Sequence, residues 1–167
     1  MPYQIDQSIK IEATSKDTVL GLANHHSYTV IIPGKTKLKL QSEFRLLNKP
    51  RLFIYRTFIA GVVLLIKYAR VDQNHEVLVD NEYLYLEPLL LNIYQELTQH
   101  PSRSYPPITF HSIGKKSPAH RICYLTMSGK IPPNRILTYQ ELKKLTLKEK
   151  TRVLKRRMIT AVRHPRV

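Results

Sequence analysis

The longest apolar run of the chain, Thr57 to Ile66 (TFIAGVVLLI), most strongly limits how this sequence can fold. A helix that crosses a membrane needs about 20 such residues, and Arg56 and Lys67 close this run too early. We therefore expect no membrane span, and we interpret the run as part of a buried core. Periodicity over Arg51–Ala69 does not separate a buried helix from a strand followed by a helix, and we favour a helix over most of it.

The segments that precede this run have the character of strands. They alternate apolar and polar residues or are rich in β-branched residues, and turn residues separate them. The pattern predicts an antiparallel meander of Ser8–Ala13, Thr18–Ala23, Tyr28–Pro33 and Lys35–Gln41, in which Lys35, Lys37 and Lys39 face solvent. A short helix over Gln41–Asn48 would follow.

The segments that follow the run alternate between strands and helices. Glu76–Asp80 (EVLVD) predicts a central strand, Leu86–Gln99 a helix with Pro88 in its first turn, and Ile108–Ile113 another strand. Ser117 as N-cap and Pro118 as first helical residue predict a short helix that ends before Gly129.

Together these segments predict an α/β fold with a mixed sheet of about five strands and flanking helices. We assign this domain to residues 1–130 and a basic, helical C-terminal extension to residues 131–167. Two capping boxes, Thr138-x-x-Glu141 and Thr146-x-x-Glu149, predict two helices in the extension, at about 139–145 and 147–162.

The charge of the chain indicates a polyanionic partner. There are 27 Lys and Arg residues against 12 Asp and Glu, a net charge of +15, and such an excess attracts nucleic acid, whether DNA or RNA. A helix in the extension could lie along a phosphate backbone through Lys148, Arg152, Lys155, Arg156 and Arg157. Its apolar face could instead bind a protein partner or a membrane surface, or the helix could simply pack on the domain.

The cysteine content indicates the compartment. Cys123 is the single cysteine of the sequence, so an internal disulfide is excluded and a zinc site is disfavoured. The N-terminal residues lack the basic-then-apolar pattern of a signal peptide. We therefore expect an intracellular protein, located in the cytoplasm or on the nucleoid.

Acidic residues cluster around the predicted central strand. Asp80 ends that strand, where open α/β sheets place functional groups, and Glu82 and Glu87 follow it, while Glu12 lies in the predicted first strand. Carboxylate oxygens suit Mg²⁺ or Mn²⁺, and such ions can act on a phosphodiester. The alternative is that Glu12 pairs with a lysine of the meander and that Asp80 and Glu87 cap the helix over Leu86–Gln99.

The segment from Gly114 to His120 is a candidate phosphate site. Lys115 and Lys116 directly precede the helix that Ser117 caps, and the free N–H groups and dipole of a helix N-terminus favour an anion. His120 would lie in the first turn, where it could donate to a phosphate or move a proton. The alternative is a solvated basic turn with a capping serine.

The order of elements resembles the ribonuclease H-like superfamily, which includes nucleases, resolvases and transposases, over about residues 5–128. The resemblance implies a carboxylate in the first strand and another at the end of the fourth, and Glu12 (KIEA) and Asp80 (VLVDNEY) match these positions. The family usually also has a Glu in the first long helix and an acid near the last helix, whereas Arg51–Ala69 and Ala119–Met127 contain none. Either the glutamates after Asp80 complete a variant metal site, or the fold has kept binding and lost catalysis.

These observations favour a metal-dependent nuclease that cleaves phosphodiester bonds, with Glu12, Asp80 and His120 as catalytic residues. The main alternative is a non-catalytic nucleic-acid-binding protein or a component of a nucleoprotein assembly, and whether the chain is an enzyme stays open. A third interpretation is a protein–protein adaptor that uses the C-terminal helix. Tyr83, Tyr85 or Tyr105 could stack on bases, although most tyrosines of such a chain belong to the core or the surface.

Overall fold

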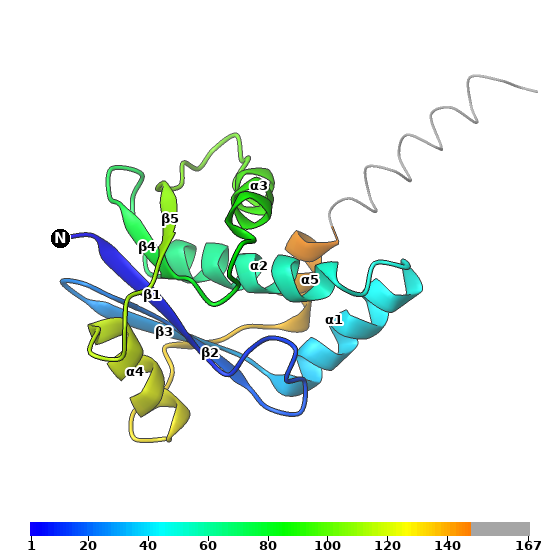
Figure 1. Cartoon of the computed structure of the whole chain (residues 1–167), viewed down its shortest axis with the longest axis horizontal. Coiled ribbons are helices and arrows are strands. Elements are labelled where there is room, and N and C mark those ends of the chain that lie inside the picture. The colour runs from blue at the N-terminus through cyan, green and yellow to red at the C-terminus, as the bar shows by residue number, and fades with distance from the viewer. Residues whose placement is uncertain (148–167) are drawn as a thin grey trace, which may run out of the picture.

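The computed structural model describes residues 1–147 and has an α/β fold, with helices packed around one mixed six-stranded sheet (Figure 1). The elements in chain order are β1 (Tyr3–Ser8), β2 (Thr18–Ala23), β3 (Ser27–Ile32), α1 (Gly34–Leu46), α2 (Leu52–Tyr68), β4 (Val77–Asp80), α3 (Glu87–Leu97), β5 (Ile108–His111), α4 (Pro118–Met127), β6 (Arg135–Ile136) and α5 (Tyr139–Thr146). Across the sheet the strand order is β5-β4-β1-β2-β3-β6.

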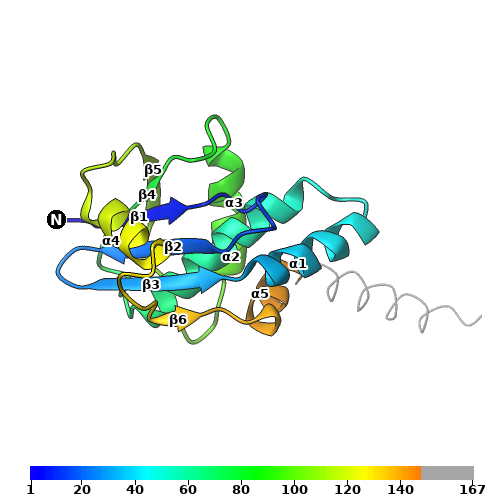
Figure 2. The same ribbon diagram turned by 90° about the horizontal axis from the view of Figure 1, so that it is seen from below.

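The strands run in both directions. β1, β2 and β3 form an antiparallel meander. On the other side of β1, β4 is parallel to β1 and β5 is parallel to β4, while the two-residue β6 pairs in parallel with β3 at the opposite edge. Figure 2 shows these two edges, with β5 and β6 on opposite sides of the meander. The predicted mixed sheet is confirmed, with a sixth strand added.

The two faces of the sheet are covered by different helices. Leu20 and Gly21 are neighbours in β2, so they face opposite sides. A Cβ on Gly61 of α2 would lie 2.6 Å from Cδ1 of Leu20, whereas a Cβ on Gly21 would lie 2.7 Å from Sγ of Cys123 in α4. α2 therefore covers one face and α4 the other, as Figure 1 also shows.

The apolar run of the sequence is the central helix α2, as predicted. It packs against α1, α3 and α5 as well as against β2 and β3, which explains why it is apolar on nearly every side. Ile59 and Leu65 are fully buried, and burial of such a side chain contributes about 1.5–3 kcal/mol. None of the helices in residues 1–147 has the length and apolar character that crossing a membrane requires.

The predicted strand over Lys35–Gln41 is wrong, because this segment lies in helix α1. Its alternating pattern placed Lys37 in solvent, but Lys37 is fully buried, and the apolar Leu38 beside it is 51% exposed. The spacing that the fold uses is helical: Lys37, Leu40 and Phe44 lie on the buried side of α1. Tertiary packing therefore overrides the local alternation.

The first strand lies earlier than predicted. It runs from Tyr3 to Ser8 rather than over Ser8–Ala13, and the positive φ of 64° at Ile9 turns the chain at the point where the strand ends. Glu12 consequently lies in the turn after β1, and it is exposed.

The later elements agree with the sequence prediction. Ser117 caps α4 and accepts a hydrogen bond from the N–H of His120, and Gly129 follows the helix with a φ of 74°. Thr138 and Glu141 form the predicted capping box of α5. Leu137, Leu142 and Leu147 belong to the same core as α2, so residues 135–147 pack on the domain, while the second predicted helix (147–162) lies almost wholly outside the described residues.

Candidate metal centre

The register of two parallel strands brings two aspartates together. Ile5 of β1 is opposite Val79 of β4, so the next residues along the two strands, Asp6 and Asp80, are also neighbours on one face of the sheet. Gly21 is opposite Asp6 on β2, which identifies this face as the one that α4 covers.

A third carboxylate joins the two aspartates. Glu82 follows the end of β4, where its N–H donates to the carbonyl of Asp80 at 3.0 Å. One carboxylate oxygen from each of Asp6, Asp80 and Glu82 lies within 4.8 Å of the other two. This group, which we call the acidic centre, could hold a metal ion, because oxygen ligands at such spacing suit a divalent cation.

The acidic centre is electrostatically expensive without a cation. Asp6 is 4% exposed; burial raises the pKa of Asp6, the charge of Asp80 adds to this, and hydrogen bonds from Gln7 and His120 oppose it. Burial also raises the pKa of Glu82, and the negative charge of Asp80 raises it further. Two ionised carboxylates about 5 Å apart repel each other by roughly 3 kcal/mol at an effective dielectric constant of about 20.

Hydrogen bonds from the backbone fix the two aspartates. Oδ1 of Asp6 accepts from the N–H of Gln7 at 2.8 Å, and Oδ1 of Asp80 accepts from the N–H of Ile113 at 2.9 Å. The other oxygen of Asp6, Oδ2, lies 2.7 Å from Nδ1 of His120. Such outer contacts orient ligand side chains in metal sites.

Close packing of α4 on the sheet places His120 at the acidic centre. The missing side chain of Gly21 lets Ile122 and Cys123 approach β2, and Sγ of Cys123 donates to the carbonyl of Asp6 at 3.2 Å. His120 lies one helical turn before the contacting residues, and its side chain is 41% exposed. The imidazole therefore contacts both the centre and solvent.

Basic residues lie on the segments that flank the acidic centre. Nζ of Lys10 is 4.0 Å from Oε2 of Glu82. His111 is opposite Asp80 on β5 and is exposed. The loop that leaves β5 carries the exposed Lys115 and Lys116, a few residues after the N–H group that binds Asp80. Ser117 is 6% exposed and caps α4.

The structure brings together part of the predicted metal set. Asp80 and Glu82 lie together in the acidic centre, whereas Glu12 and Glu87 lie outside it. His120, which was predicted as a catalytic residue and not as a metal ligand, contacts Asp6. Glu12 accepts a hydrogen bond from the hydroxyl of Tyr83 at 3.4 Å, and Glu87 accepts one from Nδ2 of Asn81 at 2.6 Å.

Asp6 is the site residue that the sequence prediction missed. The available signal was an acid inside an apolar, strand-like segment (YQIDQS), but the first strand was placed five residues later. The predicted backbone contacts Lys148, Arg152, Lys155, Arg156 and Arg157 all lie outside the described residues.

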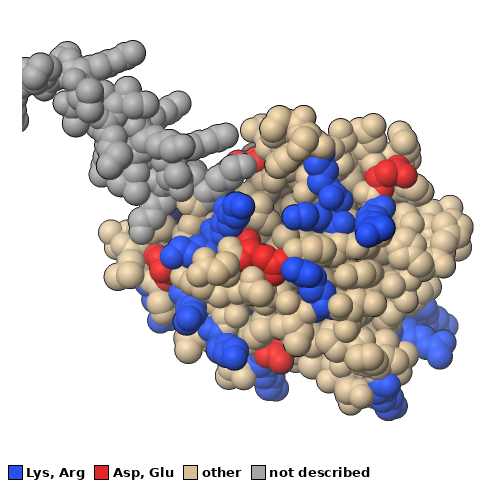
Figure 3. All heavy atoms as spheres, turned by 180° about the vertical axis from the view of Figure 1, so that it is seen from behind, with Lys and Arg blue, Asp and Glu red and all other residues tan. Residues whose placement is uncertain are grey.

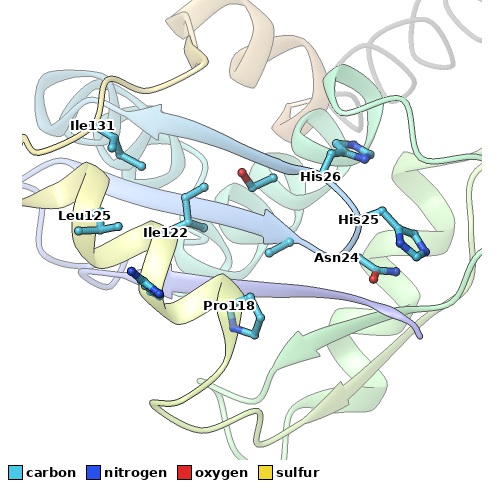
Figure 4. Close-up of a pocket in the computed structure, with 10 residues that line it drawn as sticks. Asn24, His25, His26, Pro118, Ile122, Leu125 and Ile131 are labelled. Carbon is cyan, nitrogen blue, oxygen red and sulfur yellow. The ribbon is translucent and has the colours of Figure 1, made fainter.

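A hollow of about 380 Å³ lies between α4 and the turn that joins β2 and β3. Figure 4 shows His25 of the β2–β3 turn on one side and Pro118, Ile122 and Leu125 of α4 on the other. Arg121 also lines it. The hollow and the acidic centre therefore share helix α4.

Positive charge is spread over one face of the described surface. Figure 3 shows Lys and Arg distributed over the side seen from behind, with fewer Asp and Glu among them. Several Lys and Arg side chains of the described residues lie over rings, for example Arg135 at 3.9 Å from the ring centroid of Tyr68 and Lys39 at 5.0 Å from that of Tyr139.

Comparison of the chain with family models, with curated proteins and with solved structures finds no significant match.

Proposed function

We propose that the protein is a nuclease that uses a divalent metal ion, Mg²⁺ or Mn²⁺, to cleave phosphodiester bonds. The observation that carries this proposal is the convergence of Asp6, Asp80 and Glu82 in a chain whose net charge is +15. Acids are scarce in this chain, and three of them are placed where they repel one another. A bound cation offsets that repulsion and would interact with the phosphate of a nucleic acid.

The topology supports the resemblance to the ribonuclease H-like superfamily. Three antiparallel strands are followed by two strands that add in parallel beside β1, and helices connect these strands. The resemblance implies a carboxylate in the first strand and one at the end of the fourth. Asp6, rather than Glu12, fits the first position, and Asp80 fits the second. In α4, where the family usually has an acid, His120 lies against Asp6.

The residues of the site have separate roles in this proposal. Asp6, Asp80 and Glu82 would hold the metal, which supplies Lewis-acid activation of water and of the phosphodiester. Lys115 and Lys116 bind a neighbouring phosphate as point charges.

His120 is held by Asp6 through Nδ1. The second ring nitrogen, Nε2, can then hold or deliver a proton at the water or at the leaving oxygen.

The test is cleavage of labelled single- and double-stranded DNA and RNA in the presence of Mg²⁺, Mn²⁺ or EDTA. We expect cleavage that EDTA abolishes and that is lost in Asp6→Asn and in Asp80→Asn. Asparagine keeps the size and the acceptor oxygen of each side chain, so the fold should survive. Glu12→Gln is the matched control and should keep its activity. Cleavage that survives in either Asn variant would remove the acidic centre from the mechanism.

Binding without cleavage under every condition would favour the alternative, a non-catalytic nucleic-acid-binding protein. In that case affinity should fall steeply with salt, because binding through phosphates releases counterions.

A further inference from the structure

Two large apolar side chains are exposed to solvent in the loop that carries Glu82 of the acidic centre. Leu84 is 63% exposed and Tyr85 is 91% exposed, and both lie in the loop between β4 and α3, two and three residues after Glu82. A single exposed apolar side chain is ordinary on a protein surface, but here two adjacent ones lie in the same loop as a residue of the candidate site. Together they form a small apolar surface that a ligand at the site could contact.

The loop that carries these side chains is anchored at its base by contacts with the core and with β5. Tyr83 is 8% exposed, and its ring packs edge-on against Tyr55 and Phe58, with centroids 5.6 Å and 5.2 Å away. The N–H of Asn81 donates to the carbonyl of His111 at 3.1 Å. The base of the loop is thus tied to the core and to β5.

The tip of the loop has an unfavourable backbone conformation. Tyr85 has a φ of 66°, which L-residues with large side chains rarely adopt. Such strain persists where the surrounding structure enforces it and is common in ligand-contacting loops. The conformation directs an aromatic ring into solvent from a rigid support.

We propose that Leu84 and Tyr85 form a wedge on which an unpaired base of the substrate stacks. This inference rests on the proposed function and names its substrate class: a nucleic acid whose base beside the cleaved phosphate is unpaired or unstacked. A continuous duplex hides the faces of its bases, whereas a single strand, a flap or a distorted duplex offers one to Tyr85.

The structure separates Tyr85 from the other tyrosines that could stack on bases. Tyr83 is buried, and Tyr105 is partly buried, with Arg103 5.1 Å from its ring centroid. Tyr85 presents its ring freely at 91% exposure.

The surroundings of the wedge favour a nucleic acid over a protein partner. A stable protein interface buries about 800 Å² on each partner, which two side chains do not provide, whereas stacking needs one ring face. The nearby cations also match a phosphate backbone: Lys10 lies 4.0 Å from Glu82 and 5.7 Å from the ring centroid of Tyr83. Lys115 and Lys116 lie in the loop that follows the neighbouring strand β5.

The first experiment measures binding of a fluorescein-labelled oligothymidylate and of a blunt duplex of equal length, in EDTA so that a metal-dependent nuclease does not cut them. Stacking contributes about 5- to 150-fold in affinity per base, so Tyr85→Ala should lose this factor on the single strand and little on the duplex. Tyr85→Phe should bind like the wild type. Tyr124→Ala is the control, because Tyr124 is also exposed (59%) but lies on α4.

The second experiment reports contact directly. The chain contains no tryptophan, so Tyr85→Trp introduces a single tryptophan, whose selectively excited fluorescence the oligothymidylate should quench, while Tyr124→Trp should respond weakly. The inference is overturned if Tyr85→Ala binds the single strand like the wild type, if it loses equal affinity for both ligands, or if the tryptophan at position 85 is not quenched. A wild-type protein that shows this stacking but does not cleave in Mg²⁺ would refute the proposed function and leave the wedge in place.

Discussion

Replacing Lys37 with methionine should change how the stability of the protein depends on pH. The side chain of Lys37 is fully buried, and its ammonium donates to the carbonyl of Ala13 at 2.7 Å, to Oγ1 of Thr18 at 2.9 Å and to the carbonyl of Lys10 at 3.4 Å. These bonds hold the connection between β1 and β2, which also carries Lys10 beside the acidic centre.

Burial lowers the pKa of Lys37 to about 8, although the charges of Asp17 and Glu12 oppose this. In the unfolded chain a lysine has a pKa of about 10.4. Between these values the unfolded chain keeps a proton that the folded chain has released, so the free energy of unfolding rises with pH. At about 1.36 kcal/mol for each pKa unit the rise is at most about 3 kcal/mol. We expect about 2 kcal/mol, because two of the acceptors are partly accessible to water.

Methionine has a similar stem and does not titrate, so the Lys37→Met variant should lack this rise. Urea unfolding followed by circular dichroism between pH 7 and pH 10 measures the free energy of unfolding of both proteins. Their difference should shift in favour of the wild type by about 2 kcal/mol over this range. Lys35→Met, an exposed lysine of the same helix, is the control and should follow the wild type. Parallel curves for the wild type and Lys37→Met would refute the reasoning.

Three further predictions concern packing and charge. Gly21→Ala should destabilise the protein by about 1–3 kcal/mol in urea unfolding, because its Cβ would lie 2.7 Å from Sγ of Cys123, and adding Cys123→Ala should recover part of the loss. Asp6→Asn should raise the melting temperature at pH 8 in EDTA, because burial raises the pKa of Asp6 and the ionised carboxylate destabilises the folded state. This gain should shrink toward pH 4. A variant with a lower melting temperature than the wild type at pH 8 would contradict the prediction. Arg56→Met should lower the free energy of unfolding by about 3 kcal/mol, because Arg56 is 4% exposed and binds Glu96 through both terminal nitrogens, at 2.9 Å and 3.1 Å. A loss below about 1 kcal/mol in urea unfolding would contradict this prediction.

The sequence predicted those elements whose signals are local. Ser117 and Pro118 mark the start of α4, and Thr138 with Glu141 marks the start of α5, because a cap needs residues that are close in the chain. Helix α2 was predicted for a similar reason: its length and apolar character leave few other structures.

The failures concern features that depend on distant partners. The alternation over Lys35–Gln41 was outweighed by helical packing, in which Leu40 and Phe44 enter the core and the ammonium of Lys37 bonds to carbonyls of the preceding loop. The two-residue strand β6 pairs with β3, and the side chain of Asn134, next to it, accepts a hydrogen bond from the N–H of Thr29 in β3 at 2.8 Å. No pattern inside either segment carries this information.

The candidate site was half predictable for the same reason. Asp80 was found because a strand that ends in an acid is visible in the sequence, and Glu82 lies two residues away. Asp6 was missed because its role depends on the register between β1 and β4, and because the first strand was placed at Ser8–Ala13. That placement led to Glu12 being assigned as the carboxylate of the first strand in place of Asp6.

The most direct test of the account is a titration of the wild-type protein with Mn²⁺, followed by electron paramagnetic resonance of the free ion. We expect saturable binding that is lost in Asp6→Asn and unchanged in Glu12→Gln, because the first carboxylate belongs to the acidic centre and the second contacts Tyr83. A wild-type protein that leaves Mn²⁺ free, or an Asp6→Asn variant that binds it equally well, would contradict the central claim that Asp6, Asp80 and Glu82 form a metal centre.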